Sequence, residues 1–408
     1  MSQRPAFEVA DVFRRYRDSF LATHGDSASL AQRRILDLLP ACRTAALGGH
    51  LDQCDTCSQT VVSFNSCRDR HCPKCLATAT AEWLEARQKE LLSTAYFHVV
   101  FTLPGSLRPI ALQNPTVVYD LLFRAASETL LQIAGDPRHL GAQIGVLAIL
   151  HTWSQNLQHH PHVHCVIPGG GISPDKTRWI SCRDGFFLPV RVLSRLFRGK
   201  LLAFLQTAFD AGAMTFHGSL EPLRDAKVFR ALLSTVRRKE WVVYAKPPFG
   251  GPDQVLKYLA RYTHRVAISN HRLISIDDDK VTFRWKDYAD GSRPRKMTLS
   301  ATEFVRRFLL HVLPRRFVRI RYYGFFANRH RKANLALCHS LLGEPKPVVT
   351  PTPMETDGLL PPDSDTKPSR DHRPSCPFCR NGHLVILRQL RPDEVPLFDV
   401  HKAPRDTT

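Results

Sequence analysis

Cysteines at metal-ligand spacing are the first chemical feature of the sequence. Five of the eleven cysteines fall between positions 54 and 75, and four of them make two Cys-x2-Cys pairs. Each such pair supplies two thiolates from a tight turn, and structural zinc prefers four such ligands in a tetrahedron. We therefore expect one structural zinc ion, held by Cys54, Cys57, Cys72 and Cys75. Nearby donors could change this set by one ligand or hold a second ion: His50, Cys67 and His71.

Two possible ligands of a second zinc site lie near the end of the sequence, where Cys376 and Cys379 form another Cys-x2-Cys pair. His372 and His383 flank this pair at a spacing that suits a Cys2His2 zinc site. The pair is a candidate second zinc site, and the alternative is a free pair in a tail.

Two histidines alternate in the segment HPHVHCVIPGGG (160–171). On a strand, His162 and His164 would point to one face and offer two nitrogens to a divalent ion. His151 ends the preceding apolar segment, so antiparallel pairing would bring it opposite the other two as a third ligand, with Gln155 the next candidate. Such a set leaves coordination positions open for substrate oxygens. The alternative is a polar sheet face.

Two tyrosines, Tyr258 and Tyr262, lie four residues apart in a segment with a helical pattern, which puts both hydroxyls on one face. Three cations interleave with them: Lys257, Arg261 and Arg265. A phenol with a pKa near 10 attacks phosphorus well only where a metal and positive groups hold the phosphate. Histidines, tyrosines and cations together suit phosphoryl transfer, whereas core packing is the simpler explanation of the tyrosine pair alone.

The elements that position these residues suggest an α+β protein. Two helices are expected within 6–39, and a charged helix within 76–94. From residue 96 onward, short β-branched and aromatic runs alternate with helical stretches, and residues 271–299 look like a three-stranded meander. The expected domains are therefore a helical zinc-binding domain (1–95), an α+β domain (96–343), and a linker with a C-terminal tail (344–408).

Charge and hydropathy narrow the class of partner. The formal net charge is +20, which predicts a surface that binds a polyanion, although a merely soluble basic protein is the alternative. Arg68 and Arg70, beside the cysteine pairs, are candidate phosphate contacts. No apolar run approaches the roughly 18 residues of a membrane span, and no signal peptide follows Met1, so we expect a cytoplasmic protein with no membrane partner.

The combination resembles a known family. His162-Val163-His164 followed by a glycine run, and then Tyr258-x3-Tyr262, resembles the two-tyrosine form of the HUH endonuclease superfamily. The preceding cysteine module, LARYTHRVAISNHRL (259–273) and RIRYYGFFANRHRK (319–332) are similar to rolling-circle transposases of insertion-sequence family ninety-one.

The resemblance implies a palm with a central antiparallel sheet and flanking helices, preceded by a helical zinc-binding module. It implies that Tyr258 and Tyr262 cleave single-stranded DNA, leaving a 5′-phosphotyrosine and a free 3′-hydroxyl, with Mg or Mn held by His162 and His164. The implied partners are single-stranded transposon ends, target DNA and a host helicase or replication machinery, in a bacterial cytoplasm and associated with the nucleoid through DNA. Alternatives are a plasmid replication initiator or relaxase of the same superfamily, or a non-catalytic zinc-dependent DNA-binding protein.

Overall fold

A five-stranded antiparallel sheet lies at the centre of the computed structural model, which describes residues 5–76, 83–84, 87–88, 90–249, 254–255, 267–287, 290–343 and 373–395. Its strand order is β12-β4-β5-β3-β8, and every neighbouring pair is antiparallel. The strands are β3 (Tyr96–Thr102), β4 (Gly145–Trp153), β5 (His159–Pro168), β8 (Val243–Phe249) and β12 (Ile320–Gly324). The expected α+β class, with a central antiparallel sheet and flanking helices, is confirmed.

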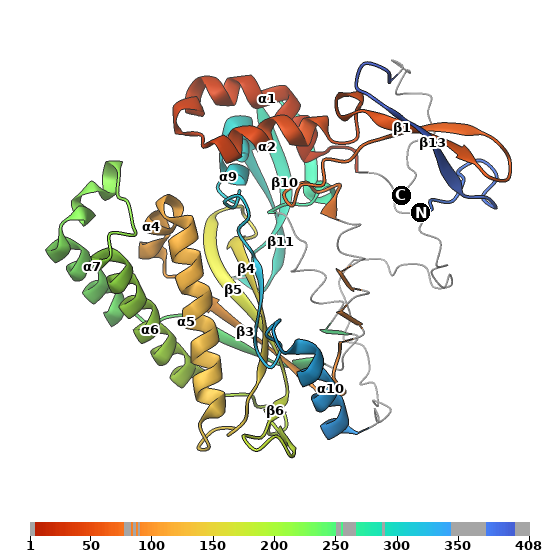
Figure 1. Ribbon diagram of the computed structural model, residues 1–408. Helices are drawn as coiled ribbons and strands as arrows, with labels where there is room; N and C mark the ends of the chain where they lie inside the picture. The colour runs from red at the N-terminus through yellow and green to blue at the C-terminus, as the bar shows by residue number, and fades with distance from the viewer. Residues whose placement is uncertain are drawn as a thin grey trace.

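Helices cover one face of this sheet (Figure 1). Along β5, Val163, Cys165 and Ile167 point into the core beneath these helices, because side chains alternate between the two faces of a strand. The alternate residues of β5 lie on the opposite face, where Val166 belongs to a separate apolar cluster. The covering helices are α4 (Arg108–Gln113), α5 (Pro115–Gly135), α6 (Val190–Asp210) and α7 (Ala226–Arg238).

The N-terminal helices and the meander share a second core. Helix α1 (Val9–His24) packs on α2 (Leu30–Ala41), whose N-terminus is closed by a reciprocal capping box between Ser29 and Gln32. Phe13 of α1 meets Phe308 edge-on at a ring-centroid distance of 5.1 Å. The meander and its helix are β9 (Leu273–Asp277), β10 (Lys280–Asp287), β11 (Arg293–Ser300) and α9 (Ala301–Leu309). The N-terminal helices therefore pack across the boundary that we expected near residue 95.

Segments from the N-terminal and C-terminal regions of the sequence pair in a third sheet, of order β13-β1-β2 (Figure 1). Strands β1 (Gly49–Cys54) and β2 (Thr60–Phe64) form a hairpin, and β13 (Leu384–Leu390) pairs with β1 from Cys54↔Leu384 to Gly49↔Leu390. Part of the expected C-terminal tail is thus a strand of this sheet. The remaining elements are β6 (Gly170–Ile172), β7 (Trp179–Ser181), α10 (Arg331–Leu342) and the 3-10 turns at 25–27, 45–47, 105–107, 218–224 and 270–272.

Most of the expected elements are present. Of the helix expected within 76–94, the described residues 76, 83–84 and 87–88 are helical, whereas 90–94 are not. The expected helix that carries the tyrosine pair lies largely outside the described residues, which include Gln254 and Val255, both helical. Among the helices of the described ranges, none is both long and apolar enough to cross a bilayer.

Gly324 ends β12 with a φ of +61°, and a Cβ built there would lie 1.8 Å from the carbonyl oxygen of Ile144, the residue before β4. We therefore expect Gly324→Ala to lower the free energy of unfolding by about 2–4 kcal/mol, measured by denaturant titration. The control is Gly199→Ala on the exposed face of α6, where the added Cβ meets nothing within 4 Å. This change should stabilise the protein by up to about 1 kcal/mol. Equal stability of the two variants would contradict the prediction.

Candidate functional site

Three histidines meet on the face of the central sheet opposite α5 and α6. Strands β4 and β5 pair antiparallel with His151 opposite His162 and Ile149 opposite His164, as the sequence predicted. One nitrogen from each of His151, His162 and His164 lies within 4.8 Å of the other two. Gln155, the other candidate ligand, lies in the turn between the strands, where its carbonyl accepts a hydrogen bond from Arg272.

Neighbouring groups orient two of these imidazoles. Nδ1–H of His162 donates to the carbonyl oxygen of His160 at 2.6 Å, which leaves Nε2 as the atom with a lone pair. Burial lowers the pKa of His162 to about 4, so the ring is neutral at pH 7. Nδ1 of His164 lies 2.8 Å from Nε2 of the buried His98 on β3, so His164 can use Nε2 toward an ion. Hydrogen bonds of this kind fix the orientation of metal-ligating histidines.

The donor set suits a divalent cation. Three imidazole nitrogens on one side of an ion leave the remaining coordination positions open for substrate oxygens. The three residues therefore fit a catalytic metal site better than a closed structural one.

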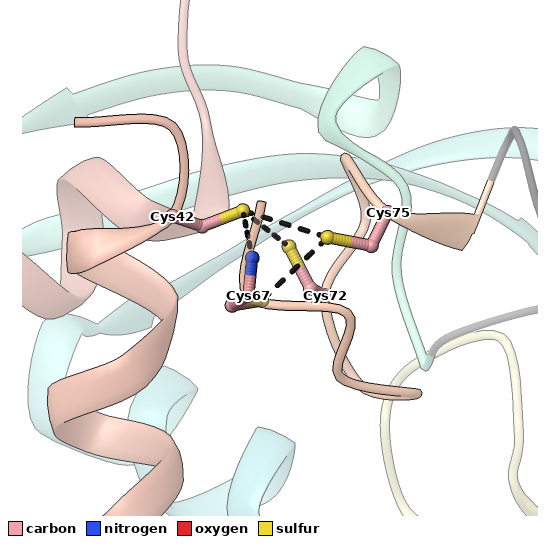
Figure 2. Close-up of side chains that lie close together, drawn as sticks. All are labelled: Cys42, Cys67, Cys72 and Cys75. Carbon is pink, nitrogen blue, oxygen red and sulfur yellow. Dashed lines mark hydrogen bonds between the residues drawn. The ribbon is translucent and has the colours of Figure 1, made fainter. Parts of the chain in front are cut away.

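Four cysteines from two segments converge at the C-terminal end of α2 (Figure 2). Cys42 follows α2, whereas Cys67, Cys72 and Cys75 come from the loop after β2. Their sulfur atoms lie 3.5 Å (Cys42 and Cys75) and 3.6 Å apart (Cys67 and Cys75, Cys42 and Cys72). Tetrahedral zinc with Zn–S bonds of about 2.3 Å would separate its sulfurs by about 3.8 Å, so the spacing fits structural zinc.

The structure corrects the predicted zinc ligands, because it separates Cys54 and Cys57 from Cys72 and Cys75. Cys54 ends β1, and the five steps from Gly49 to Cys54 carry it about 16 Å along the strand at 3.3 Å per residue. The chain then returns along β2 to the neighbourhood of α2 before it reaches Cys67. The two predicted pairs therefore lie at opposite ends of one hairpin.

Cys54 and Cys57 instead meet Cys376 and Cys379 from the far end of the sequence. The sulfurs of Cys54 and Cys379 are 3.7 Å apart, as are those of Cys57 and Cys376. Backbone amides donate to these sulfurs, and the amides of Asn381 and Gly382 lower the pKa of the Cys379 thiol to about 6. This second set also fits zinc, and the expected half-site is completed by cysteines rather than histidines. His383 contributes its backbone N–H to Asp55, and His372 lies outside the described residues.

Five predicted site residues fall outside the described residues: Tyr258, Tyr262, Lys257, Arg261 and Arg265. Val255, three residues before Tyr258, is fully buried in the apolar cluster on the histidine face of the sheet. Arg68 is exposed, whereas the guanidinium of Arg70 donates to the carbonyl oxygen of Phe317, which holds it within the fold.

Sequence reasoning missed three residues around these sites: Cys42, His98 and Arg108. Cys42 lies outside the Cys-x2-Cys pattern, and His98 and Arg108 stand singly in apolar or loop segments. From the sequence, Cys67 is only an additional candidate donor. The one feature of the sequence that indicated Cys67 as a ligand was its closeness to the Cys72 pair, five residues away.

We expect two zinc ions per chain, one for each four-cysteine cluster. Cys376→Ser/Cys379→Ser should lose one ion and release β13, because binding of zinc and folding of its site are coupled. Cys42→Ser/Cys72→Ser should lose the other ion and unfold the region around α2. Elemental analysis of the purified proteins measures the zinc, with Cys182→Ser, outside both clusters, as the control that keeps both ions. A Cys376→Ser/Cys379→Ser protein that retains two ions would contradict the second site.

Comparisons with known proteins agree with these features. Residues 12–103, which span all four ligands of the first cluster, match a family model described as "Transposase zinc-binding domain". Residues 145–334, which include the three histidines, match one described as "Putative transposase". No solved structure matches the chain significantly.

Two curated proteins are similar over most of the chain. The chain is 56% identical over 382 residues to "Putative transposase y4qJ" of Sinorhizobium fredii (strain NBRC 101917 / NGR234), which covers 93% of this chain and 94% of that protein. It is 28% identical over 306 residues to "Transposase for insertion sequence element IS801" of Pseudomonas savastanoi pv. phaseolicola, covering 71% of this chain and 68% of that protein. The chain matches both a transposase zinc-binding domain and a transposase region, and it belongs to the IS91 family of transposases.

Proposed function

We propose that this transposase nicks and rejoins single-stranded transposon ends through a 5′-phosphotyrosine intermediate, in rolling-circle transposition. The observation that carries the proposal is the cluster of His151, His162 and His164 on one face of the central antiparallel sheet. Neutral imidazoles arranged in this way can hold Mg or Mn, and such an ion, when bound, polarises a scissile phosphate.

The proposed nucleophiles are Tyr258 and Tyr262. Val255 is buried against Leu147, Ile149 and Val166 on the same sheet face as the histidines. In a helix, positions three and seven residues after Val255 share its face, so the spacing supports tyrosines directed toward the histidine cluster. Lys257, Arg261 and Arg265 would neutralise the phosphates beside them.

The reaction balances without an external energy source. The phenolic oxygen attacks phosphorus, a Tyr–O–P bond forms, and the P–O3′ bond breaks, with the 3′-oxygen leaving as a hydroxyl after it takes up a proton. A free 3′-hydroxyl can later attack the phosphotyrosine and return the proton to the phenol. Because one phosphoester replaces another, rejoining needs no ATP. Two tyrosines permit two successive strand transfers.

The proposed partners are the single-stranded transposon ends, the target DNA and a host helicase. The sequence contains no Walker-type phosphate loop, so strand opening would come from another enzyme. Two other functions remain distinguishable by experiment. A replication initiator or relaxase would form the same adduct at a different DNA site, and a non-catalytic DNA-binding protein would form none.

His162→Ala and His164→Ala should each slow cleavage of a labelled single-stranded end by about a hundredfold or more. Affinity for the same DNA, measured by fluorescence anisotropy, should change little because phosphate contacts from many cations dominate binding. His339→Ala, at an exposed position of α10, is the control for loss of an imidazole. Normal cleavage by both variants in the presence of a chelator would exclude a metal at this cluster.

The tyrosine pair is tested by Tyr→Phe, which removes the nucleophilic oxygen and keeps the ring. One single variant should lose most of the covalent adduct on a minimal single-stranded substrate, because one phenol at a time can stand in line with the scissile phosphate. The other should cleave initially and fail at the later strand transfer. The double variant should bind DNA and form no adduct. Denaturing gels measure the adduct, and Tyr244→Phe, an exposed tyrosine on β8, is the control.

Two results would contradict this assignment. An adduct formed by the double variant would move the nucleophile elsewhere, with Tyr322 and Tyr323 of β12 the next residues to replace. A double variant with a much lower melting temperature would indicate that the tyrosines pack in the core.

A further inference from the structure

Arg108 lies beside the row of histidines and has no role in the function proposed so far. It is the first residue of α4, shortly after the end of β3, where Thr102 pairs with His162. Its Nη2 donates to Nδ1 of His160 at 2.6 Å. His160 is two residues before His162 on β5, and the centroids of their rings are 5.2 Å apart, so the guanidinium lies next to the histidine cluster.

The charge of Arg108 is not neutralised by any residue that the structure describes. Among the described residues, no carboxylate forms an ion pair with it, and His160 is the one hydrogen-bond partner of its guanidinium. Its Nε is buried without a hydrogen-bond partner, and burial lowers the pKa of the guanidinium. A partly buried cation is normally paired with an anion, because removal of the charge from water is costly.

The residue that accepts the Arg108 hydrogen bond also contacts the histidine cluster. Because a guanidinium N–H can only donate, Nδ1 of His160 is the acceptor of the Arg108 hydrogen bond. The same His160 holds Nδ1 of His162 through its backbone oxygen. One residue thus links the guanidinium to a candidate metal ligand.

We propose that Arg108 binds a non-bridging oxygen of the scissile phosphodiester beside the ion held by the histidine cluster, and that His160 orients its guanidinium. Guanidinium groups suit this task because they are always charged and present several N–H donors in a fixed plane. The site leaves Arg108 partly exposed, and its Nη1 makes no hydrogen bond to a described residue. This inference rests on the proposed function, because it places the substrate phosphate relative to the metal site.

The first test follows cleavage. In single-turnover reactions at saturating single-stranded DNA and Mn, Arg108→Gln should cleave about 10²–10³-fold more slowly, the loss typical for removal of one group that stabilises developing charge. Arg108→Lys should lie between this variant and the wild type, because the ammonium keeps the charge and loses the planar fork. The control is Arg230→Gln on the exposed side of α7, which also removes one positive charge and should cleave normally.

The second test does not depend on cleavage and uses inorganic phosphate with Mn. Manganese held at the histidines should broaden the phosphorus resonance of phosphate bound by Arg108. The broadening should be strong for the wild type and Arg230→Gln, and lost in His162→Ala, which lacks an ion ligand. Arg108→Gln should lose it as well while still binding Mn, measured by electron paramagnetic resonance.

The outcomes separate this inference from the proposed function. Arg108→Gln that broadens the phosphorus signal as the wild type does would overturn the inference, even if that variant cleaves slowly. Normal cleavage by Arg108→Gln would also overturn it and leave the proposed function intact. A wild-type protein that forms no adduct, yet shows Arg108-dependent broadening, would retain the anion site and overturn the proposed function.

Discussion

The antiparallel pairing of β4 with β5 is the contact on which the candidate catalytic site depends. It places His151 opposite His162 and brings His164 within reach of both. Because side chains alternate along a strand, a slip of one residue would turn these imidazoles toward α5 and α6 and expose Val163 and Cys165 instead. Burial of the apolar set beneath the helices therefore fixes the register. The same burial that stabilises the sheet also determines which face carries the chemistry.

The cysteine clusters join parts of the chain that lie far apart in the sequence. One cluster attaches the loop after β2 to the end of α2, and the other attaches the C-terminal strand β13 to the tip of the β1–β2 hairpin. The loop of the first cluster also contacts the segment that leads into β12: Arg70 donates to Phe317, and the N–H of Leu313 donates to Nε2 of His71. The zinc-binding region is thus packed against the sheet-bearing part of the protein. It shares a core with the meander through α1, α2 and α9.

The electrostatics of the histidine face differ from those of the whole chain. The chain carries a net charge of +20, yet burial keeps His160 and His162 neutral. Neutral imidazoles can bind a cation, whereas protonated ones would repel it. In the proposed site, the neutral histidines would bind the ion and the neighbouring guanidinium would bind the phosphate. The wider positive charge would attract DNA over a longer range without competing for the metal ligands.

Local periodicity in the sequence was sufficient to predict much of the fold and part of the site. Helices α1, α2, α5 and α6, the central strands β3, β4, β5 and β8, and the shared face of His162 and His164 follow from patterns within one segment. The Cys-x2-Cys spacing likewise indicated that two thiols share an ion, because a tight turn brings both to one point. It did not indicate which pairs meet, since that depends on where the β1–β2 hairpin carries Cys54 and on the return of β13. Cys42, His98 and Arg108 became recognisable only in the tertiary structure, because each acquires its partner from a segment that packing, rather than sequence spacing, brings alongside.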